Sequence, residues 1–166
     1  MVKTLADYIP SFESLVFLLT KVCNQPVELD TNLAEHRLDL FYRFPTGRLY
    51  LSIYEEGHSR LGQGKFFQKY KGPIVIINYF VLEQKGAGLG TNLANLLLDL
   101  LKELNFSLVI LKAKNAKAAK FWSKLAFLPL PHTSLEAPIM YLPLDNRTKS
   151  SSSLALLITR QFLTES

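Results

Sequence analysis

The feature that most constrains the fold is a short stretch in which an apolar run enters a glycine-spaced turn and then a leucine-rich segment. Gly86, Gly88 and Gly90 alternate with other residues, so no Cβ atom at these positions keeps a phosphate away from the backbone. Glycines also permit the positive φ angles that turn successive N–H groups toward one point. A helix that begins here adds free first-turn N–H groups, and Lys85 adds a charge. The stretch predicts a strand, an anion-binding turn and a helix, with a tight turn that binds nothing as the alternative.

The glycine spacing argues against two common nucleotide sites. The pattern G-x-G-x-G differs from the dinucleotide-binding motif G-x-G-x-x-G. It also differs from the P-loop, because Thr91 follows a glycine and no lysine stands before it. Both nucleotide interpretations are therefore disfavoured.

A second ordered block follows, Asn115-x-x-Ala118-x-x-Phe121-Trp122-x-Lys124-x-Ala126-Phe127. Together the two blocks resemble the GNAT superfamily of N-acetyltransferases. Its acyl-CoA pyrophosphate loop has the pattern Gln/Arg-x-x-Gly-x-Gly/Ala, and Lys85, Gly88 and Gly90 stand at the matching positions. Its later segment has the pattern Asn-x-x-Ala-x-x-Phe/Leu-Tyr-x-Lys-x-Gly-Phe. The resemblance runs from about residue 74 to 144 and is poor in the first 70 residues, where acceptor selectivity usually lies in this superfamily.

The resemblance implies a fold and a cosubstrate. The implied fold is α/β (α+β), with a mixed, mostly antiparallel central sheet that contains one parallel, splayed strand pair and is flanked by helices. The cosubstrate is acetyl-CoA, with no metal. Asn115 is expected to hold the cosubstrate, to cap the following helix, or both. The residues expected to contact acetyl-CoA are Phe80, Val81, Leu82, Lys85, Gly86, Ala87, Gly88, Leu89, Gly90, Thr91, Asn115, Lys117, Phe121, Trp122 and Lys124.

Two residues depart from the family pattern, Trp122 at the position of a tyrosine and Ala126 at the position of a glycine. In the family this tyrosine protonates the departing CoA sulfur or donates a hydrogen bond to it. An indole N–H can donate a hydrogen bond but cannot deliver a proton. Ser123 and Tyr141 are therefore candidate substitutes for the general acid. Glu83, at the end of the apolar strand, is the first candidate for the general base because it is expected to adjoin the thioester region, and the other candidates are Glu55, Glu56 and His58.

Hydrophobic periodicity predicts the order of the elements. Helices are expected over residues 11–23, 89–104 and onward from 115, with a short one near 66–70. Strands are expected over 36–44, 49–54, 73–81, 106–113, 127–130 and 139–144. The strand, helix and strand between residues 74 and 113 are long enough for a right-handed crossover, which makes these two strands parallel.

Length and composition predict one ordinary globular domain. We expect it over residues 1–145, with an acceptor-side half (1–72) and an acyl-CoA-binding half (73–145), followed by a Ser-rich linker and a C-terminal amphipathic helix over 146–166. Cys23 lies on an apolar helical stripe and is expected in the core, and the three histidines show no metal-ligand spacing. No apolar run is long enough to span a membrane, so a cytoplasmic location is the default expectation.

The net charge of +5 is unevenly distributed. Five lysines lie between residues 112 and 124 without a carboxylate, and a second basic stretch lies between Arg60 and Lys71. A helix that begins near Asn115 would carry Lys117, Lys120 and Lys124 on one face. This face could be merely solvated, could meet the 3′-phosphate of CoA, or could bind an RNA acceptor.

The predicted reaction is transfer of an acetyl group from acetyl-CoA to an amine acceptor, a small molecule or a peptide, by direct attack in a ternary complex. Two alternatives remain, a non-catalytic acyl-CoA-binding module that lacks the usual tyrosine, and an acyltransferase acting on aminoacyl-tRNA. The C-terminal helix is expected to dock on its own domain, with a homodimer as the alternative. Without a positioned general acid, catalysis is expected to be modest and to favour an amine of low pKa.

Overall fold

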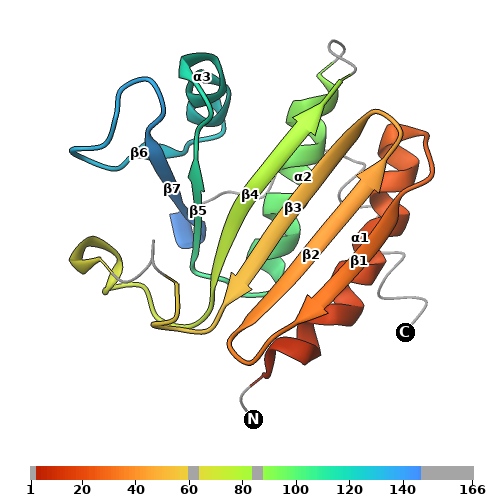
Figure 1. Cartoon of the computed structure of the whole chain (residues 1–166), viewed down its shortest axis with the longest axis horizontal. Helices are drawn as coiled ribbons and strands as arrows, with labels where there is room; N and C mark the ends of the chain where they lie inside the picture. The colour runs from red at the N-terminus through yellow and green to blue at the C-terminus, as the bar shows by residue number, and fades with distance from the viewer. Residues whose placement is uncertain (1–2, 60–63, 84–87, 147–166) are drawn as a thin grey trace.

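The computed structural model describes residues 3–59, 64–83 and 88–146, and its centre is one seven-stranded sheet in the order β1-β2-β3-β4-β5-β7-β6. Every neighbouring pair is antiparallel except β4 and β5, which are parallel (Figure 1). The predicted fold class is therefore confirmed. The strands are β1 Glu28–Leu33, β2 Arg37–Phe44, β3 Gly47–Tyr54, β4 Ile74–Leu82, β5 Leu108–Lys112, β6 Leu128–Pro129 and β7 Ile139–Pro143, and the helices are α1 Ile9–Cys23, α2 Leu89–Glu103 and α3 Ala116–Lys124.

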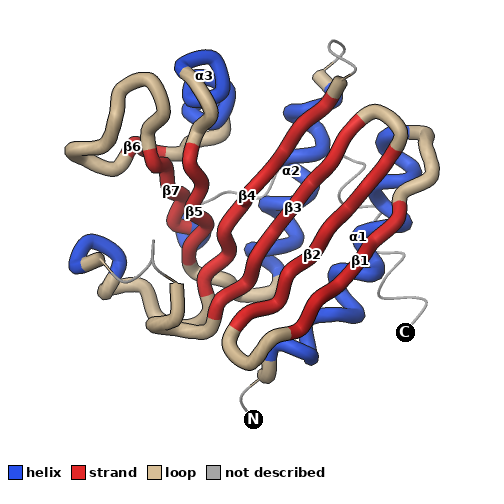
Figure 2. The backbone as a smooth tube through the Cα atoms, viewed as in Figure 1, coloured by secondary structure: helices blue, strands red, loops and turns tan. Residues whose placement is uncertain are grey.

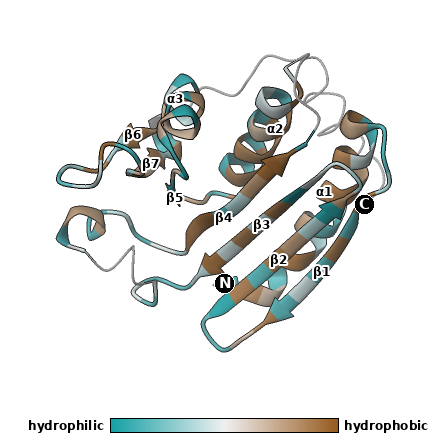
Figure 3. Cartoon of the chain, turned by 45° about the horizontal axis from the view of Figure 1, so that its top comes forward, coloured by the Kyte–Doolittle hydropathy of each residue, from teal (hydrophilic) through white to brown (hydrophobic). Residues whose placement is uncertain are grey.

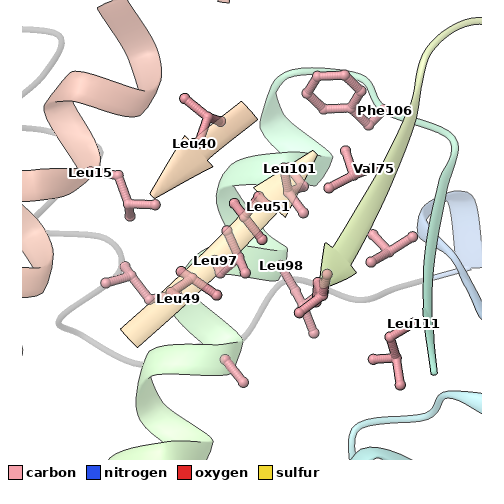
Figure 4. Packing of buried hydrophobic residues seen from close by; sticks show 14 of the residues in the cluster. Leu15, Leu40, Leu49, Leu51, Val75, Leu97, Leu98, Leu101, Phe106 and Leu111 are labelled. Atoms are coloured by element: carbon pink, nitrogen blue, oxygen red, sulfur yellow. The ribbon is translucent and has the colours of Figure 1, made fainter. Parts of the chain in front are cut away.

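The main core lies between the sheet and the helices α1 and α2, which cover the same face (Figure 2). Strands β2 and β3 alternate, so that every second side chain is apolar and turns toward these helices. Figure 4 shows Leu40 and Leu51 of the sheet meeting Leu15 of α1 and Leu97 of α2. The Tyr42 hydroxyl donates a 2.7 Å hydrogen bond to the Phe12 carbonyl and ties β2 to α1.

The opposite face of the sheet is covered only in part by described residues. Near the start of β4 and along β5, a second apolar cluster forms beneath the connection that contains a 3-10 turn, Lys65–Phe67. Its buried members are Phe67, Ile74, Ile76, Leu108 and Ile110. Farther along, β2 and β3 carry polar side chains among apolar ones (Figure 3). This face becomes important for the site.

The elements agree with the sequence prediction in type, with a few differences, the first of which is an unpredicted 3-10 turn, Leu5–Tyr8. Strand β1 was not predicted, because its side chains are mostly exposed and carry little apolar alternation. The helix expected near residues 66–70 is only the 3-10 turn Lys65–Phe67, and the strand expected over 127–130 is shortened to β6. Asp145 and Asn146 end the described chain in a 3-10 turn, Leu144–Asn146. The predicted C-terminal helix lies outside the described residues.

Candidate functional site

Strands β4 and β5 separate part of the way along the sheet. Their parallel pairing covers Val75 to Ile77 on β4 and ends where Ile77 meets Leu111, although β4 continues to Leu82. On its other side β4 stays paired with β3. One main-chain edge of β4 beyond Ile77 therefore has no strand partner among the described residues, and Figure 1 shows the two strands diverging there.

A β-bulge marks the point of separation. The β3–β4 register pairs Tyr50 with Tyr79 and Leu51 with Ile77, so Asn78 is an extra residue. A bulge bends its strand and increases the local twist. It thus accounts for the turn of β4 away from β5 beyond Ile77.

The N-terminus of α2 lies beside the end of β4. Gly88 is the N-cap residue, and its φ of 69° lies in the left-handed region that favours glycine. A Cβ on Gly90 would lie 3.3 Å from Leu82 Cδ1 and 3.6 Å from a ring carbon of Phe121, so glycine allows the helix to approach both. Lys85, Gly86 and Ala87 lie outside the described residues.

The first turn of α2 presents N–H groups without helical acceptors. The bond from the Asn92 N–H to the Gly88 carbonyl, at 2.9 Å, is the first of the helical ladder. The N–H groups of Leu89, Gly90 and Thr91 precede it and have no acceptor within the helix. With the helix dipole, they form the kind of anion-binding end that the glycine spacing predicted.

Asn115 caps α3. Its side-chain oxygen accepts a 2.8 Å hydrogen bond from the Ala118 N–H, so the predicted capping role is confirmed. Lys117, Lys120 and Lys124 are all exposed, as the helical spacing indicated.

Replacing Asn115 by alanine should lower the free energy of unfolding by about 1 kcal/mol, because the Ala118 N–H loses its acceptor. Denaturant unfolding measures this loss, and Asn115→Ser should recover most of it because serine also caps helices. A stability equal to that of the unmodified protein would show that the hydrogen bond contributes nothing. Coenzyme A affinity, measured separately, reports whether the same residue also contacts the cosubstrate.

An aromatic cluster joins the end of β4 to α3. Phe80 lies 5.6 Å from Trp122 and 6.2 Å from Phe121 between ring centroids, and Trp122 lies 5.2 Å from Phe127. Trp122 is only 6% exposed and belongs to the main core. The Trp122 indole therefore packs between β4 and α3, beside the point where β4 and β5 diverge.

The three predicted catalytic residues are placed on different elements. Glu83 is exposed just after β4, where its N–H donates to the Thr46 carbonyl at 2.7 Å. It lies five residues beyond Asn78, or about 16 Å along an extended strand. Ser123 is exposed on α3, and Tyr141 of β7 packs on Phe66 and Phe67, with ring centroids 5.0 and 5.7 Å apart. Tyr141 belongs to the second apolar cluster, whereas Trp122 belongs to the main core.

Sequence reasoning missed a polar chain that ends at the bulge. The Asn78 amide nitrogen donates to Ser52 Oγ at 2.7 Å, and Ser52 Oγ donates to Asp39 Oδ1 at 2.7 Å. Arg37 Nε donates to Asp39 Oδ2 at 3.0 Å, and the Asp39 carboxylate raises the pKa of the Arg37 guanidinium. The sequence held one signal, a carboxylate in mid-strand, but the pattern alone placed it among the outward-facing polar residues.

One set of described residues could supply three ligands to a metal ion, His36, Glu55 and His58, whose ligand atoms lie within 4.8 Å of one another. The His36 and His58 rings stack at 3.8 Å, and His36 Nδ1 lies 3.0 Å from Glu55 Oε2. No metal site was predicted here, because His36 and His58 lie far apart in the sequence. The set lies at the end of the β2–β3 hairpin away from Thr46, so it is remote from the first turn of α2.

Two further expectations concern Cys23 and membranes. The Cys23 thiol is half-buried against the main core, and burial raises its pKa, which makes it a poor nucleophile at neutral pH.

Among the described residues, no helix combines the length and apolarity needed to cross a bilayer.

Comparison with known proteins gives a family match. The model of the acetyltransferase (GNAT) family matches residues 14–127. No curated protein matches the chain.

Several solved structures are similar. A mutant of the AtaT toxin bound to the C-terminus of the antitoxin AtaR and acetyl-CoA has a TM-score of 0.46 and 19% identity, covering 73% of this chain and 72% of that one. The KacTA–DNA complex has a TM-score of 0.43 and 18% identity, covering 77% and 76%. NAA60 of Arabidopsis thaliana with acetyl-CoA has a TM-score of 0.48 and 13% identity, covering 64% and 76%.

Proposed function

Because the chain belongs to the GNAT family of acetyltransferases, we propose that it transfers an acetyl group from acetyl-CoA to a primary amine by direct attack in a ternary complex. The observation that carries this proposal is the separation of β4 from β5 beside the glycine-led end of α2. The two features supply an open main-chain edge and an anion-binding end next to each other.

In this proposal the diphosphate of acetyl-CoA binds the first turn of α2. The N–H groups of Gly88 to Thr91 face it, and Lys85, Gly86 and Ala87, which lie outside the described residues, stay predicted contacts on the strength of the motif. Gly90 lets the first turn of α2 pack against Leu82 and Phe121, because a side chain there would crowd both residues.

The pantetheine arm then lies along the free edge of β4 from Phe80 to Leu82. Its amide groups can exchange hydrogen bonds with main-chain groups that β5 leaves unpaired. Phe121 and Trp122 form the wall on the α3 side, and Lys117 and Lys124, which are exposed, are our candidates for contact with the 3′-phosphate. Asn115 supports this arrangement by capping α3.

The reaction needs a neutral amine and a leaving thiolate. The amine lone pair attacks the thioester carbonyl carbon, the C–S bond breaks, the amine nitrogen loses a proton and the sulfur leaves as thiolate or thiol. Trp122 cannot deliver that proton, and a thiol with a pKa near 8.5 is a tolerable leaving group without help. Ser123 and Tyr141 remain our candidates for assistance at the sulfur.

Glu83 remains a candidate general base, provided that water molecules connect its carboxylate to the amine. It stands at the α2 end of β4, so it could accept a proton from an amine at the bulge only through a chain of water molecules. We therefore expect Glu83→Gln to change turnover less than a change at Asn78.

The direct test is release of free thiol from acetyl-CoA in the presence of different amines, with the acetylated product identified by mass spectrometry. The proposal predicts amine-dependent release and an N-acetylated product. Binding of acetyl-CoA without release for any amine would favour the non-catalytic binding module instead, an alternative that the packing of Trp122 also accommodates.

A second candidate acceptor is aminoacyl-tRNA. The observation that favours it is the exposed row Lys117, Lys120 and Lys124 on α3. RNA affinity that falls steeply with salt, and that falls further when these lysines are replaced, would support this acceptor.

A further inference from the structure

We infer that the exposed part of the sheet face formed by β2, β3 and β4 around Asn78 is the acceptor site, and that it selects a monoamine whose amino group adjoins an aromatic ring. The inference rests on the proposed function, because it names the acceptor for the same reaction. It is carried by two observations, the fixed orientation of the Asn78 amide and a group of partly exposed aromatic rings on the same face of the sheet.

The polar chain fixes which way the Asn78 amide points. An ionised carboxylate only accepts hydrogen bonds, so the Ser52 hydroxyl must donate its proton to Asp39. The Ser52 oxygen can then only accept, and the group that donates to it must be the NH₂ of Asn78. The amide oxygen of Asn78 is left as an acceptor, and no described residue donates to it.

This chain is rigid because its inner members are buried. Asp39 is 3% exposed and Ser52 is 1% exposed. Arg37 holds one Asp39 oxygen at 3.0 Å, while Ser52 at 2.7 Å and the Tyr50 hydroxyl at 3.3 Å hold the other. A buried, satisfied network of this kind keeps the outer amide in one orientation.

Asn78 stands where a nucleophile is needed. It is the bulge residue next to Ile77, the last residue of β4 that pairs with β5. Its amide oxygen can accept one N–H of an incoming amine and so direct the nitrogen lone pair. Because the strands begin to separate at this residue, the bound amine would lie beside the thioester end of a pantetheine arm placed along β4.

Aromatic rings lie on the same face of the sheet as the Asn78 amide. Phe41 of β2 and Tyr50 of β3 stack with centroids 4.0 Å apart and planes within 14°. Tyr79 of β4 is directly opposite Tyr50 in the β3–β4 register. Phe41 is 38% exposed and Tyr79 is 46% exposed, and in Figure 1 the helices α1 and α2 lie behind these strands.

The charged residues near the rings disfavour an occupant that carries more than one positive charge. Asp39 is buried and paired with Arg37. Asp30, which is opposite Phe41 in the β1–β2 register, is paired with Arg43, so neither aspartate offers a free carboxylate to a second ammonium group. Arg48 is exposed on β3, two residues from Tyr50 and therefore on the same strand face. A polyamine or a lysine-rich segment would meet this positive charge, whereas an aromatic monoamine would cover the rings.

The test measures binding of phenylalanine amide and alanine amide to the protein saturated with CoA, by calorimetry. The two ligands share an α-amine and differ by a phenyl ring. We expect the phenyl compound to bind at least about tenfold more tightly, which is the order expected for burial of one ring. Spermidine should bind more weakly than the phenyl compound.

The variants Phe41→Ala and Tyr79→Ala should each remove most of this preference. The matched control is Phe17→Ala, since Phe17 is 46% exposed on α1, behind the sheet. CoA affinity should stay within about twofold in all three variants. Equal binding of the two amides, or losses no larger than in Phe17→Ala, would overturn the inference.

Asn78 is tested through turnover. Asn78→Ala should lower kcat at least about tenfold while CoA affinity and melting temperature stay near those of the unmodified protein, and Ser52→Ala should lower kcat in the same direction through the freed amide. Unchanged kcat in Asn78→Ala would remove Asn78 from the site.

If the ring preference holds but no amine releases thiol, the proposed reaction fails while the binding site stands. If acetyl transfer occurs without ring preference, the inference alone fails.

Discussion

Replacing Gly88 by aspartate should weaken CoA binding by about 100-fold or more. Gly88 caps α2 with a φ of 69°, and no atom of the described residues lies within 4 Å of the point that a Cβ would occupy, so an aspartate there would present its charge at the helix end. Two like charges 4 Å apart near a protein surface repel by about 4 kcal/mol, and each 1.4 kcal/mol changes affinity tenfold. Screening by solvent reduces this repulsion, so we expect the affinity for CoA to fall by about 100-fold.

The matched control is Gly72→Asp. Gly72 also has a positive φ, 86°, and open space around its Cβ position, so it shares the backbone cost of a side chain. It precedes the start of β4, at the end of the strand away from α2. We expect Gly72→Asp to bind CoA like the unmodified protein and Gly88→Asp to lose binding in the same calorimetric titration. Equal affinities for the two variants would remove the diphosphate from the α2 end.

Acceptors with amines of low pKa should react about 300-fold faster than lysine-like amines at pH 7, compared as kcat/KM. An α-amine with a pKa near 7.8 is about 14% neutral at this pH, whereas a lysine amine near 10.4 is about 0.04% neutral. The reaction needs the neutral form, and Glu83, the first candidate base, stands about 16 Å along β4 from the bulge. No described carboxylate of the proposed site is both free and adjacent to Asn78, so the protein gives little help in removing the proton.

The measurement is kcat/KM for amines of similar size and different pKa between pH 6 and 9. We expect log kcat/KM to rise with unit slope up to the pKa of each amine, and rates expressed per neutral amine to agree. A lysine side chain that reacts at pH 7 as fast as an α-amine would show that the site contains an effective general base.

Local sequence determined much of this fold. The end of β4, the glycine turn and α2 follow one another directly, so their types could be predicted from the pattern of residues 74–104. The α3 cap was predictable for the same reason, because Asn115 and Ala118 are three residues apart. The resemblance to the GNAT family added the divergence of β4 and β5, which the strand pairing confirms.

The acceptor side depends on contacts between strands and was not predictable in this way. Asp39, Ser52 and Asn78 lie on three strands and meet only through the register of β2, β3 and β4. The resemblance to the GNAT family implied a bulge beside the splayed strands, but its position at Asn78 depends on the β3–β4 register, and no single residue signals it. Glu83 was chosen because it was expected to adjoin the thioester region, yet the bulge at Asn78 lies five residues earlier in β4. The stacked pair His36 and His58 was missed for the same reason.

A crystal structure of the complex with acetyl-CoA would show whether the end of α2 and the free edge of β4 hold the cosubstrate together. We predict the diphosphate within hydrogen-bonding distance of the N–H groups of Leu89, Gly90 and Thr91, with the pantetheine amides paired to main-chain groups of β4 between Phe80 and Leu82. Acetyl-CoA bound elsewhere, or bound with this edge of β4 unused, would contradict the prediction.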